Sequence, residues 1–233
     1  RLREKIEATP KFEDNTLTVY FSDHGDFMGS HNIFQRKEYP HEESVRIPAV
    51  FHWPDHIPAK GMTPELWSLV DLLPTTLGLA GAAIPKHLQG RDYSPLLRGE
   101  EFKAPDDLLL EMVGNPRWSL DLLDWRGLVN DRWKYAYLET GHELLFDLEN
   151  DPFELNNVAN DNPDVCTVLK ARLLKLLSES REPYYDVLIE HGVKPQTPVR
   201  DVSPSGSSVL VPCAEKLSPA WEDMIVRAPD ANA

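Results

Sequence analysis

The stretch TLTVYFSDHGDFMGSHNIFQRKEYPHEESVRIPAVFHWP, residues 16 to 54, has two apolar runs on either side of a polar segment. The first run, residues 16 to 22, is rich in β-branched and aromatic side chains, which predicts a buried strand. The second run, residues 47 to 53, predicts another strand. Between them, a segment that opens with Asp23-His24-Gly25 shows little periodicity, which predicts a long functional loop over residues 23 to 44. Ligands of open α/β sheets bind beyond the carboxyl ends of strands, so this loop is the first candidate for a site.

The patterns outside this stretch predict an α/β region followed by an antiparallel one. Helices are expected over residues 1 to 8 and 72 to 80. Later, short strand-like runs separated by turn residues predict an antiparallel meander, with strands at residues 108–113, 126–129, 133–138 and 143–147. A helix beginning at Pro163 is expected to cover one side of the meander with an apolar face made of Val165, Val168, Leu169, Leu173, Leu176 and Leu177.

These elements divide the chain into three parts. Residues 1–104 form the predicted α/β region, and residues 105–193 form the antiparallel sheet with its covering helix. Residues 194–233 are rich in Pro and Ser, which predicts an extended tail. The chain starts at Arg1 inside an apparent helix and without an initiator Met, which indicates a fragment or the later part of a longer chain.

The composition excludes some classes of protein. Hydrophobic content of 41% and charged content of 27% are ordinary for a globular protein with a sizeable core. The apolar runs are too short for a transmembrane segment. A formal net charge of -14 argues against a nucleic-acid partner, because binding a phosphate backbone needs a basic face. The surplus of carboxylates leaves ligands for a divalent cation, and nothing in the sequence fixes the compartment.

The polar loop carries the residue types of a metal and anion site. Asp23 and His24 offer a hard oxygen and a nitrogen to a divalent metal, although an Asp that caps the loop beside a hydrogen-bonded His explains the pair equally well. Four further cationic or donor side chains indicate an anionic ligand, while a solvated face is the alternative for each of them: His31, Arg36, Lys37 and His41. Nearby, Glu42 and Glu43 are expected to pair with Arg46 rather than to act in catalysis.

An ordered set of motifs resembles the sulfatases of the alkaline-phosphatase superfamily. The set comprises Ser22-Asp-His-Gly25, Gly29-Ser-His31, Lys37 four residues before His41-Glu-Glu-Ser44, Val45-Arg-Ile-Pro48, Val70-Asp-Leu-Leu-Pro-Thr-Thr-Leu77, Leu88-Gln-Gly-Arg-Asp92 and Leu145-Phe-Asp-Leu-Glu-Asn-Asp-Pro152. As an ordered set over about residues 15 to 177 it is specific, whereas each motif alone is not. The resemblance implies that the first 104 residues are the C-terminal part of an alkaline-phosphatase-like α/β sandwich, followed by a smaller antiparallel subdomain.

The resemblance also implies roles for single residues. Asp23 would ligate Ca²⁺, with Mg²⁺ or Mn²⁺ less favoured, and His24 would contact the metal or the ester oxygen and act as general acid. Lys37 would bind the sulfate, although a one-residue insertion would give that place to Arg36. His31 would lie near the substrate. The expected ligand is a sulfate ester, such as a sulfated sugar or an aryl sulfate.

One part of the sulfatase pattern is absent from these residues. Sulfatases attack sulfur with a formylglycine made within a Cys/Ser-x-Pro-x-Arg motif, and neither Cys166 nor Cys213 stands in such a motif. The resemblance therefore implies a formylglycine upstream of this chain, in a missing N-terminal segment or a partner chain, and an inactive isolated fragment. Two alternatives stay open: a phosphonate or phosphate ester hydrolase of the same superfamily, and a non-catalytic calcium-binding or interaction module.

The aromatic residues of the meander allow two interpretations. They could line a sugar-binding rim or pack the interior of the sheet. Because alternate positions of a strand need one apolar face, core packing is favoured for Trp118, Trp125, Trp133, Tyr135 and Tyr137.

Overall fold

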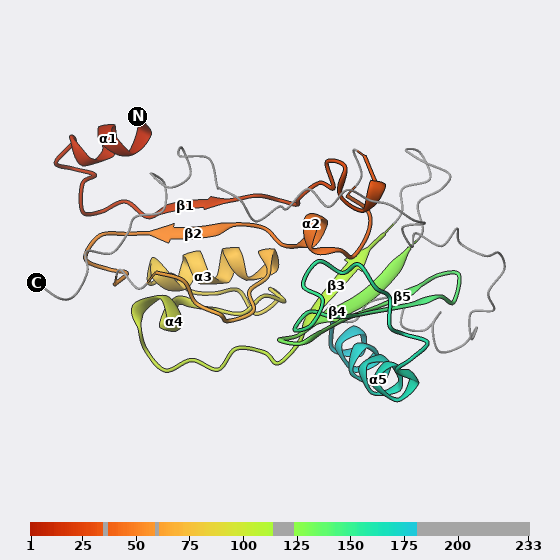
Figure 1. The fold of residues 1–233 in the computed structure, drawn as a ribbon. Helices are drawn as coiled ribbons and strands as arrows, with labels where there is room; N and C mark the ends of the chain where they lie inside the picture. Colours follow the sequence, from red (N-terminus) through yellow and green to blue (C-terminus); the bar gives the residue numbers. More distant parts are fainter. Residues whose placement is uncertain (35–36, 59–60, 114–123, 181–233) are drawn as a thin grey trace, which may run out of the picture.

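The computed structural model describes residues 1–34, 37–58, 61–113 and 124–180 (Figure 1). The ribbon of β1 and β2 lies with α3 and α4 in one half of the molecule, and the small sheet with α5 forms the other half. No helix within these ranges is long and apolar enough to cross a membrane. In chain order, the elements are α1 Leu2–Glu7, β1 Thr18–Phe21, η1 Ser30–Asn32, α2 Glu42–Val45, β2 Ala49–His52, η2 Leu69–Asp71, α3 Leu72–Leu79, α4 Ser94–Arg98, β3 Leu108–Met112, β4 Trp125–Val129, β5 Trp133–Leu138, β6 Glu143–Asp147 and α5 Pro163–Ser180.

The two strands of the opening stretch pair as an antiparallel ribbon. Thr18 lies opposite His52 and Phe21 lies opposite Ala49. Tyr20 is 44% exposed and Phe21 is 41% exposed, so the prediction of a buried strand is wrong for this chain. The physical reason is that side chains alternate between the two faces of a strand, and a ribbon of two strands covers neither face by itself.

Helices α3 and α4 are joined beside the ribbon by side-chain to backbone hydrogen bonds. Asp71 is buried, and its two carboxylate oxygens accept the backbone N–H groups of Ser68 at 2.9 Å and Arg91 at 2.7 Å. Arg98 at the end of α4 donates to the carbonyl oxygen of Gly78 in α3 at 2.9 Å. These bonds fix the connection between η2, α3 and α4.

Strands β3 to β6 form the antiparallel meander that the sequence predicts. Their order in the sheet is the order of the chain, and every neighbouring pair is antiparallel. Side chains alternate between the two faces, so on β5 Tyr135 and Tyr137 point to one face while Lys134, Ala136 and Leu138 point to the other. Both faces of β5 are buried, which means that each face has its own cover.

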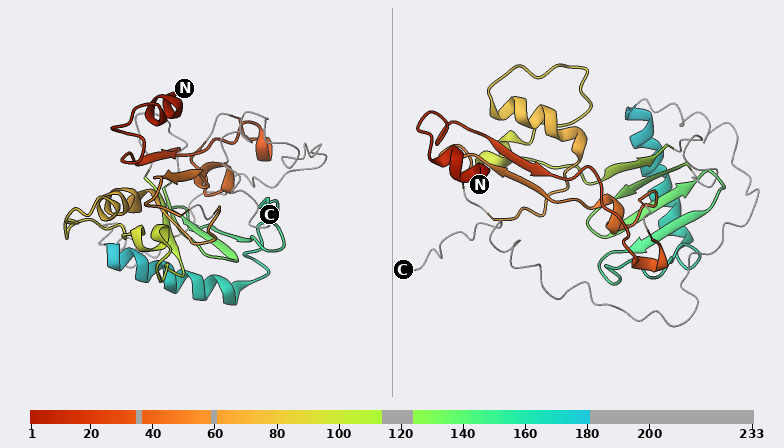
Figure 2. Two further views of the ribbon diagram at one scale, coloured as in Figure 1. Left: turned by 90° about the vertical axis from the view of Figure 1, so that its left-hand side faces the viewer. Right: turned by 90° about the horizontal axis from the view of Figure 1, so that it is seen from above.

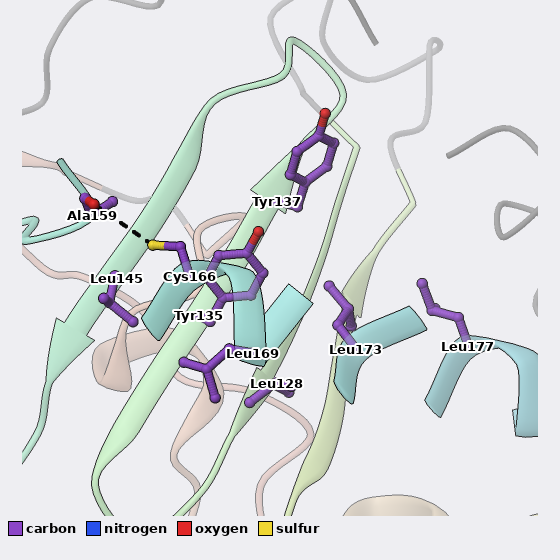
Figure 3. Packing of buried hydrophobic residues seen from close by; sticks show 9 residues of the cluster. All are labelled: Leu128, Tyr135, Tyr137, Leu145, Ala159, Cys166, Leu169, Leu173 and Leu177. Atoms are coloured by element: carbon purple, nitrogen blue, oxygen red, sulfur yellow. Dashed lines mark hydrogen bonds between the residues drawn. The ribbon is translucent and has the colours of Figure 1, made fainter. Parts of the chain in front are cut away.

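Helix α5 covers the first of these faces, where the main core lies (Figure 2). Figure 3 shows the sheet residues Leu128 and Tyr135 beside the side chains on the inner face of α5. That inner face carries the buried residues Cys166, Leu169, Leu173 and Leu177. Val168 is 58% exposed, so its predicted place on the apolar face is wrong. At 3.6 residues per turn Val168 falls on the side of the helix away from the sheet, and Cys166 lies on the buried face where Val168 was expected.

The opposite face of the small sheet packs against the loop region of the other half. A second buried cluster there holds Trp125, Ala136 and Leu138, and Val45 of α2 packs against it. With Tyr135 and Tyr137 in the main core, the prediction of core packing is confirmed for three of the aromatic residues, Trp125, Tyr135 and Tyr137. Trp118 and the predicted tail over residues 194–233 lie outside the described residues. The proposed boundaries at residues 104 and 193 stay predictions.

Candidate active site

The loop between β1 and β2 brings Asp23, His24 and Lys37 together. The ammonium nitrogen of Lys37 lies 2.8 Å from Nε2 of His24, across thirteen positions of sequence. Oδ2 of Asp23 lies 3.6 Å from the same nitrogen, and the Asp23 side chain is 81% exposed. A carboxylate, an imidazole and an ammonium therefore meet at one open point of the surface, where a cation and an anion could bind side by side.

Hydrogen bonds fix the ring of His24 in one tautomer. Nδ1 lies 2.8 Å from the carbonyl oxygen of Gly25, which can only accept, so Nδ1 carries the proton. Nε2 is then free to accept from the Lys37 ammonium. The hydroxyl of Ser22 donates to the His24 carbonyl at 2.7 Å and fixes the backbone below the ring. The site thus holds an oriented imidazole whose Nε2 faces its partners.

Asp23 is held as a carboxylate. Its Oδ1 accepts the backbone N–H of His24 at 3.0 Å. The pKa of Asp23 is lowered, first by a hydrogen bond from its own backbone and then by electrostatic interaction with the neighbouring His24 and Lys37 side chains. An ionised, exposed carboxylate is a hard oxygen donor that is available to a cation.

Ser44 in α2 joins the two ends of the cluster. The N–H of Gly25 donates to the carbonyl oxygen of Ser44 at 2.8 Å, and the hydroxyl of Ser44 donates to the carbonyl oxygen of Lys37. A Cβ atom at position 25 would lie 1.9 Å from the carbonyl oxygen of Glu43, so only glycine allows this close approach. One short helix therefore sets the backbone on both sides of the His24–Lys37 contact.

His31 lies behind the exposed cluster as one half of an ion pair. Its side chain is 5% exposed, and its Nε2 lies 3.2 Å from Oε1 of Glu43. The hydrogen bond with Glu43 raises the pKa of His31 despite burial. Burial raises the pKa of Glu43, but the hydrogen bonds from His31 and Ser30 outweigh it and bring that pKa to about 2. A substrate contact of His31 stays a prediction, and Arg36 lies outside the described residues.

His41 packs in the same buried region without joining the ion pair. Its ring centroid lies 4.6 Å from that of His31 and 5.0 Å from that of Phe146 on the small sheet. Burial, with the nearby positive charges of His31 and Lys134, lowers the pKa of His41 to about 4. His41 is therefore neutral at ordinary pH and acts as a packing residue between the loop and the sheet.

Glu42, next to His41, is part of a buried ion network that sequence reasoning missed. Glu42 pairs with Arg46 at 3.5 Å, as expected, whereas the same expectation for Glu43 is wrong because its carboxylate pairs with His31. Glu42 also lies 2.6 Å from the ammonium nitrogen of Lys134, which lies 2.7 Å from Glu154. The side chains of Lys134 and Glu154 are 0% exposed. The signal available in the sequence was a lysine inside an otherwise apolar strand, since such a lysine needs a buried anion.

The residues of the cluster fit part of a metal site. Asp23 Oδ2 and His24 Nε2 are close enough for one cation to contact both. Lys37 occupies the same nitrogen, so the ammonium and a metal would compete for it. Within the described ranges, no group of three or more His, Cys, Asp or Glu side chains is placed to hold a metal ion. The pair therefore fits as two donors of a larger set.

Comparisons with known proteins give the family. The family model described as N-sulphoglucosamine sulphohydrolase, C-terminal, matches residues 29–182. An ulvan-active sulfatase of Formosa agariphila is 31% identical over 172 residues, which cover 71% of this chain and 33% of that protein. The chain thus spans about a third of the length of this curated relative.

Solved structures agree with the sequence relatives. A 2-O GAG sulfatase superimposes with a TM-score of 0.72 at 28% identity, covering 78% of this chain and 40% of that one. A phosphonate monoester hydrolase of Agrobacterium radiobacter gives a TM-score of 0.68 at 26% identity, covering 77% and 38%. The likeness confirms the predicted fold class, the C-terminal part of an alkaline-phosphatase-like α/β fold with a small antiparallel sheet. The chain belongs to the N-sulphoglucosamine sulphohydrolase C-terminal family, and so to the sulfatases.

Proposed function

We propose that this chain is part of a Ca²⁺-dependent sulfatase, a sulfuric ester hydrolase, and that it supplies one wall of the active site. The observation that supports this most is the meeting of Asp23, His24 and Lys37 at one exposed point, with Lys37 2.8 Å from His24. A sulfate monoester carries charge on its nonbridging oxygens and develops more on the leaving oxygen, so its hydrolysis needs fixed positive charge at both places. The cluster offers groups for both.

Each residue of the cluster has a separate proposed role. Lys37 would turn its ammonium from His24 to the sulfate group and neutralise its charge. His24 would then have Nε2 free and, once protonated there, would donate to the leaving oxygen as general acid. Asp23 would hold the metal, with Nε2 of His24 as a ligand only if His24 does not act as the acid, and a bound metal supplies Lewis-acid stabilisation of the ester oxygens. Ca²⁺ is proposed ahead of Mg²⁺ or Mn²⁺ because an exposed loop carboxylate suits a large cation with flexible geometry.

The nucleophile is proposed to lie outside these 233 residues. The sequence contains no Cys/Ser-x-Pro-x-Arg motif, in which the formylglycine of sulfatases is made. The match covers only 33% of the ulvan-active sulfatase, which supports a contribution from further residues. We therefore expect the isolated 233-residue chain to be inactive toward sulfate esters.

The proposed substrate class is a sulfated sugar, with aryl sulfates as simpler substrates of the same chemistry. The support is the likeness to the 2-O GAG sulfatase. A second candidate is a phosphonate ester hydrolase, which the likeness to the phosphonate monoester hydrolase favours. Both reactions use the same cluster, because both esters carry negative charge on nonbridging oxygens.

A comparison of two substrates in the full-length protein tests the proposal. Rates on 4-nitrophenyl sulfate and on a phenylphosphonate monoester are compared for the unmodified protein and for Lys37→Ala. We expect the sulfate to be the better substrate and Lys37→Ala to lose that activity. Preference for the phosphonate would replace the proposed reaction with the second candidate. Turnover of the sulfate by the isolated chain, abolished by Asp23→Ala, would show that the nucleophile lies within these residues.

A further inference from the structure

The small sheet contacts the backbone next to Lys37 directly. Trp125 of β4 points to the face opposite α5, and its indole Nε1 donates to the carbonyl oxygen of Glu38 at 2.6 Å. Glu38 is the residue after Lys37. Trp125 is buried, so its N–H needs a partner, and the loop backbone is that partner.

The same face of the sheet holds the other end of the segment. Lys134 lies between the carboxylates of Glu42 and Glu154, at 2.6 and 2.7 Å. Oε2 of Glu154 also accepts the backbone N–H of Glu42 at 2.6 Å, at the start of α2. Phe146, opposite Lys134 on β6, packs against His41. The sheet thus contacts positions 38, 41 and 42 in turn, along the segment that follows Lys37.

These contacts fix geometry more than they add stability. Replacing a buried ion pair by apolar residues is often neutral for stability, so the net energy of the Lys134 contacts does not explain them. A rigid sheet holds the loop in one position, whereas Lys37 on an unsupported loop would sample many positions. Ser44 of α2 is hydrogen-bonded to the carbonyl of Lys37 and to the N–H of Gly25, so the position of α2 sets the positions of both groups.

We propose that Trp125, together with the Lys134–Glu154 pair, positions Lys37 for the sulfate group. This inference rests on the proposed function, because it assigns Lys37 to the substrate. Trp125 and Lys134 are positioning residues, since they act through the loop backbone and do not reach the exposed cluster. The small sheet is then a platform for the active site.

A double-mutant cycle in the full-length protein tests the proposal. Trp125→Phe removes the indole N–H and keeps an aromatic ring, and it is made alone and with Lys37→Ala. Trp133→Phe is the matched control, because Trp133 packs against the α5 side of the sheet. Measured on 4-nitrophenyl sulfate, we expect Trp125→Phe to lower kcat/KM by about tenfold to a hundredfold in the unmodified protein, and less than about twofold beside Lys37→Ala. Trp133→Phe is expected to leave kcat/KM unchanged both in the unmodified protein and beside Lys37→Ala.

The outcomes separate this inference from the proposed function. An equal loss from Trp125→Phe in both backgrounds, or no loss in either, overturns the positioning role and leaves the function standing. If Lys37→Ala itself leaves the rate unchanged, the assignment of Lys37 fails and the inference fails with it.

Hydrogen exchange gives a readout that does not depend on activity. Amides of residues 37 to 45 should exchange faster in Trp125→Phe than in Trp133→Phe. Unchanged protection of these amides in Trp125→Phe would contradict the proposal that the sheet positions this segment. If Trp125→Phe does not fold, Ser44→Ala, which removes the bond to the Lys37 carbonyl, replaces it in the same cycle and must give the same pattern.

Discussion

Lys37 donates to Nε2 of His24 at 2.8 Å, although thirteen positions of loop separate the two residues. The contact supports the proposal of Lys37 as sulfate ligand, while Arg36 lies outside the described residues. We expect Lys37→Met in the full-length protein to lower kcat/KM on an aryl sulfate by about 10²-fold or more, because a fixed charge at the ester is lost. Arg36→Met is the matched control and should cost only a few-fold. The reverse order would give the sulfate contact to Arg36.

Gly25 should tolerate no side chain. A Cβ atom there would lie 1.9 Å from the carbonyl oxygen of Glu43, so Gly25→Ala must move backbone and should cost about 3 kcal/mol or more. Gly81→Ala is the comparison, because it has a positive φ of +67° but no atom within 4 Å, and should cost about 1 kcal/mol. Urea unfolding of the two variants measures the difference, and equal costs would contradict the close approach.

His41 should make the fold sensitive to acid. Its folded pKa of about 4 lies below the ordinary 6.5, so above about pH 6.5 it is neutral in both states and has no effect. As the pH falls toward about 4, only the unfolded state takes up the proton, and stability falls by about 3 kcal/mol at most. His31, whose pKa is raised, acts with the opposite sign, since its contribution is present below pH 6.5 and is lost as the pH rises through its folded pKa.

The test compares His41→Phe with the unmodified chain by urea unfolding at about pH 7 and about pH 4.5. The phenylalanine fills the site against Phe146, and the acid-dependent loss should shrink. The exposed His87 gives the control His87→Phe, which should leave the loss unchanged. An undiminished loss in His41→Phe would place the acid sensitivity in other groups.

The core under α5 should depend on Leu173. The side chain is 1% exposed, so Leu173→Ala should lower the free energy of unfolding by about 2–5 kcal/mol. Val168→Ala, on the same helix but 58% exposed, should cost less than about 1 kcal/mol. Chemical denaturation followed by tryptophan fluorescence measures both. A large effect at Val168 would indicate an interface on the outer side of the helix.

Breaking the buried ion network should cost more than replacing it. Lys134→Met alone leaves Glu154 buried without its cation, which should destabilise the fold by about 3–5 kcal/mol. Adding Glu154→Gln keeps an acceptor for the backbone N–H of Glu42 and removes the unpaired charge, so part of that stability should return. Additive losses in the double variant would contradict direct pairing.

Local signals in the sequence were enough for the later half of the chain. Turn residues at regular spacing and runs of alternating side chains predicted all four strands of the meander. The pattern is reliable there because all four strands pair with one another within this chain. The helix from Pro163 was predicted for the same reason, although the hydrophobicity of Val168 was mistaken for burial. Hydrophobicity alone does not fix which side of a helix faces the core.

The site was predictable only in part, because its members are held by contacts that are distant in sequence. Asp23 and His24 are adjacent and formed a visible pair, and the family resemblance added Lys37. Lys134 and Trp125 come from the sheet, about ninety positions from their partners in the loop. A lysine or a tryptophan in a strand looks like a surface or a core residue until the fold places an acceptor beside it.

Asp23 lies just beyond the end of β1 in the ribbon, while Glu38, the residue after Lys37, is hydrogen-bonded to the four-stranded sheet. A two-stranded ribbon is marginally stable by itself, and a four-stranded sheet packed on a helix is far more stable. Warming the 233-residue chain should therefore separate Asp23 from Lys37 before the sheet melts. Loss of the site's geometry and loss of the fold would then be two distinct thermal events, with the first at the lower temperature.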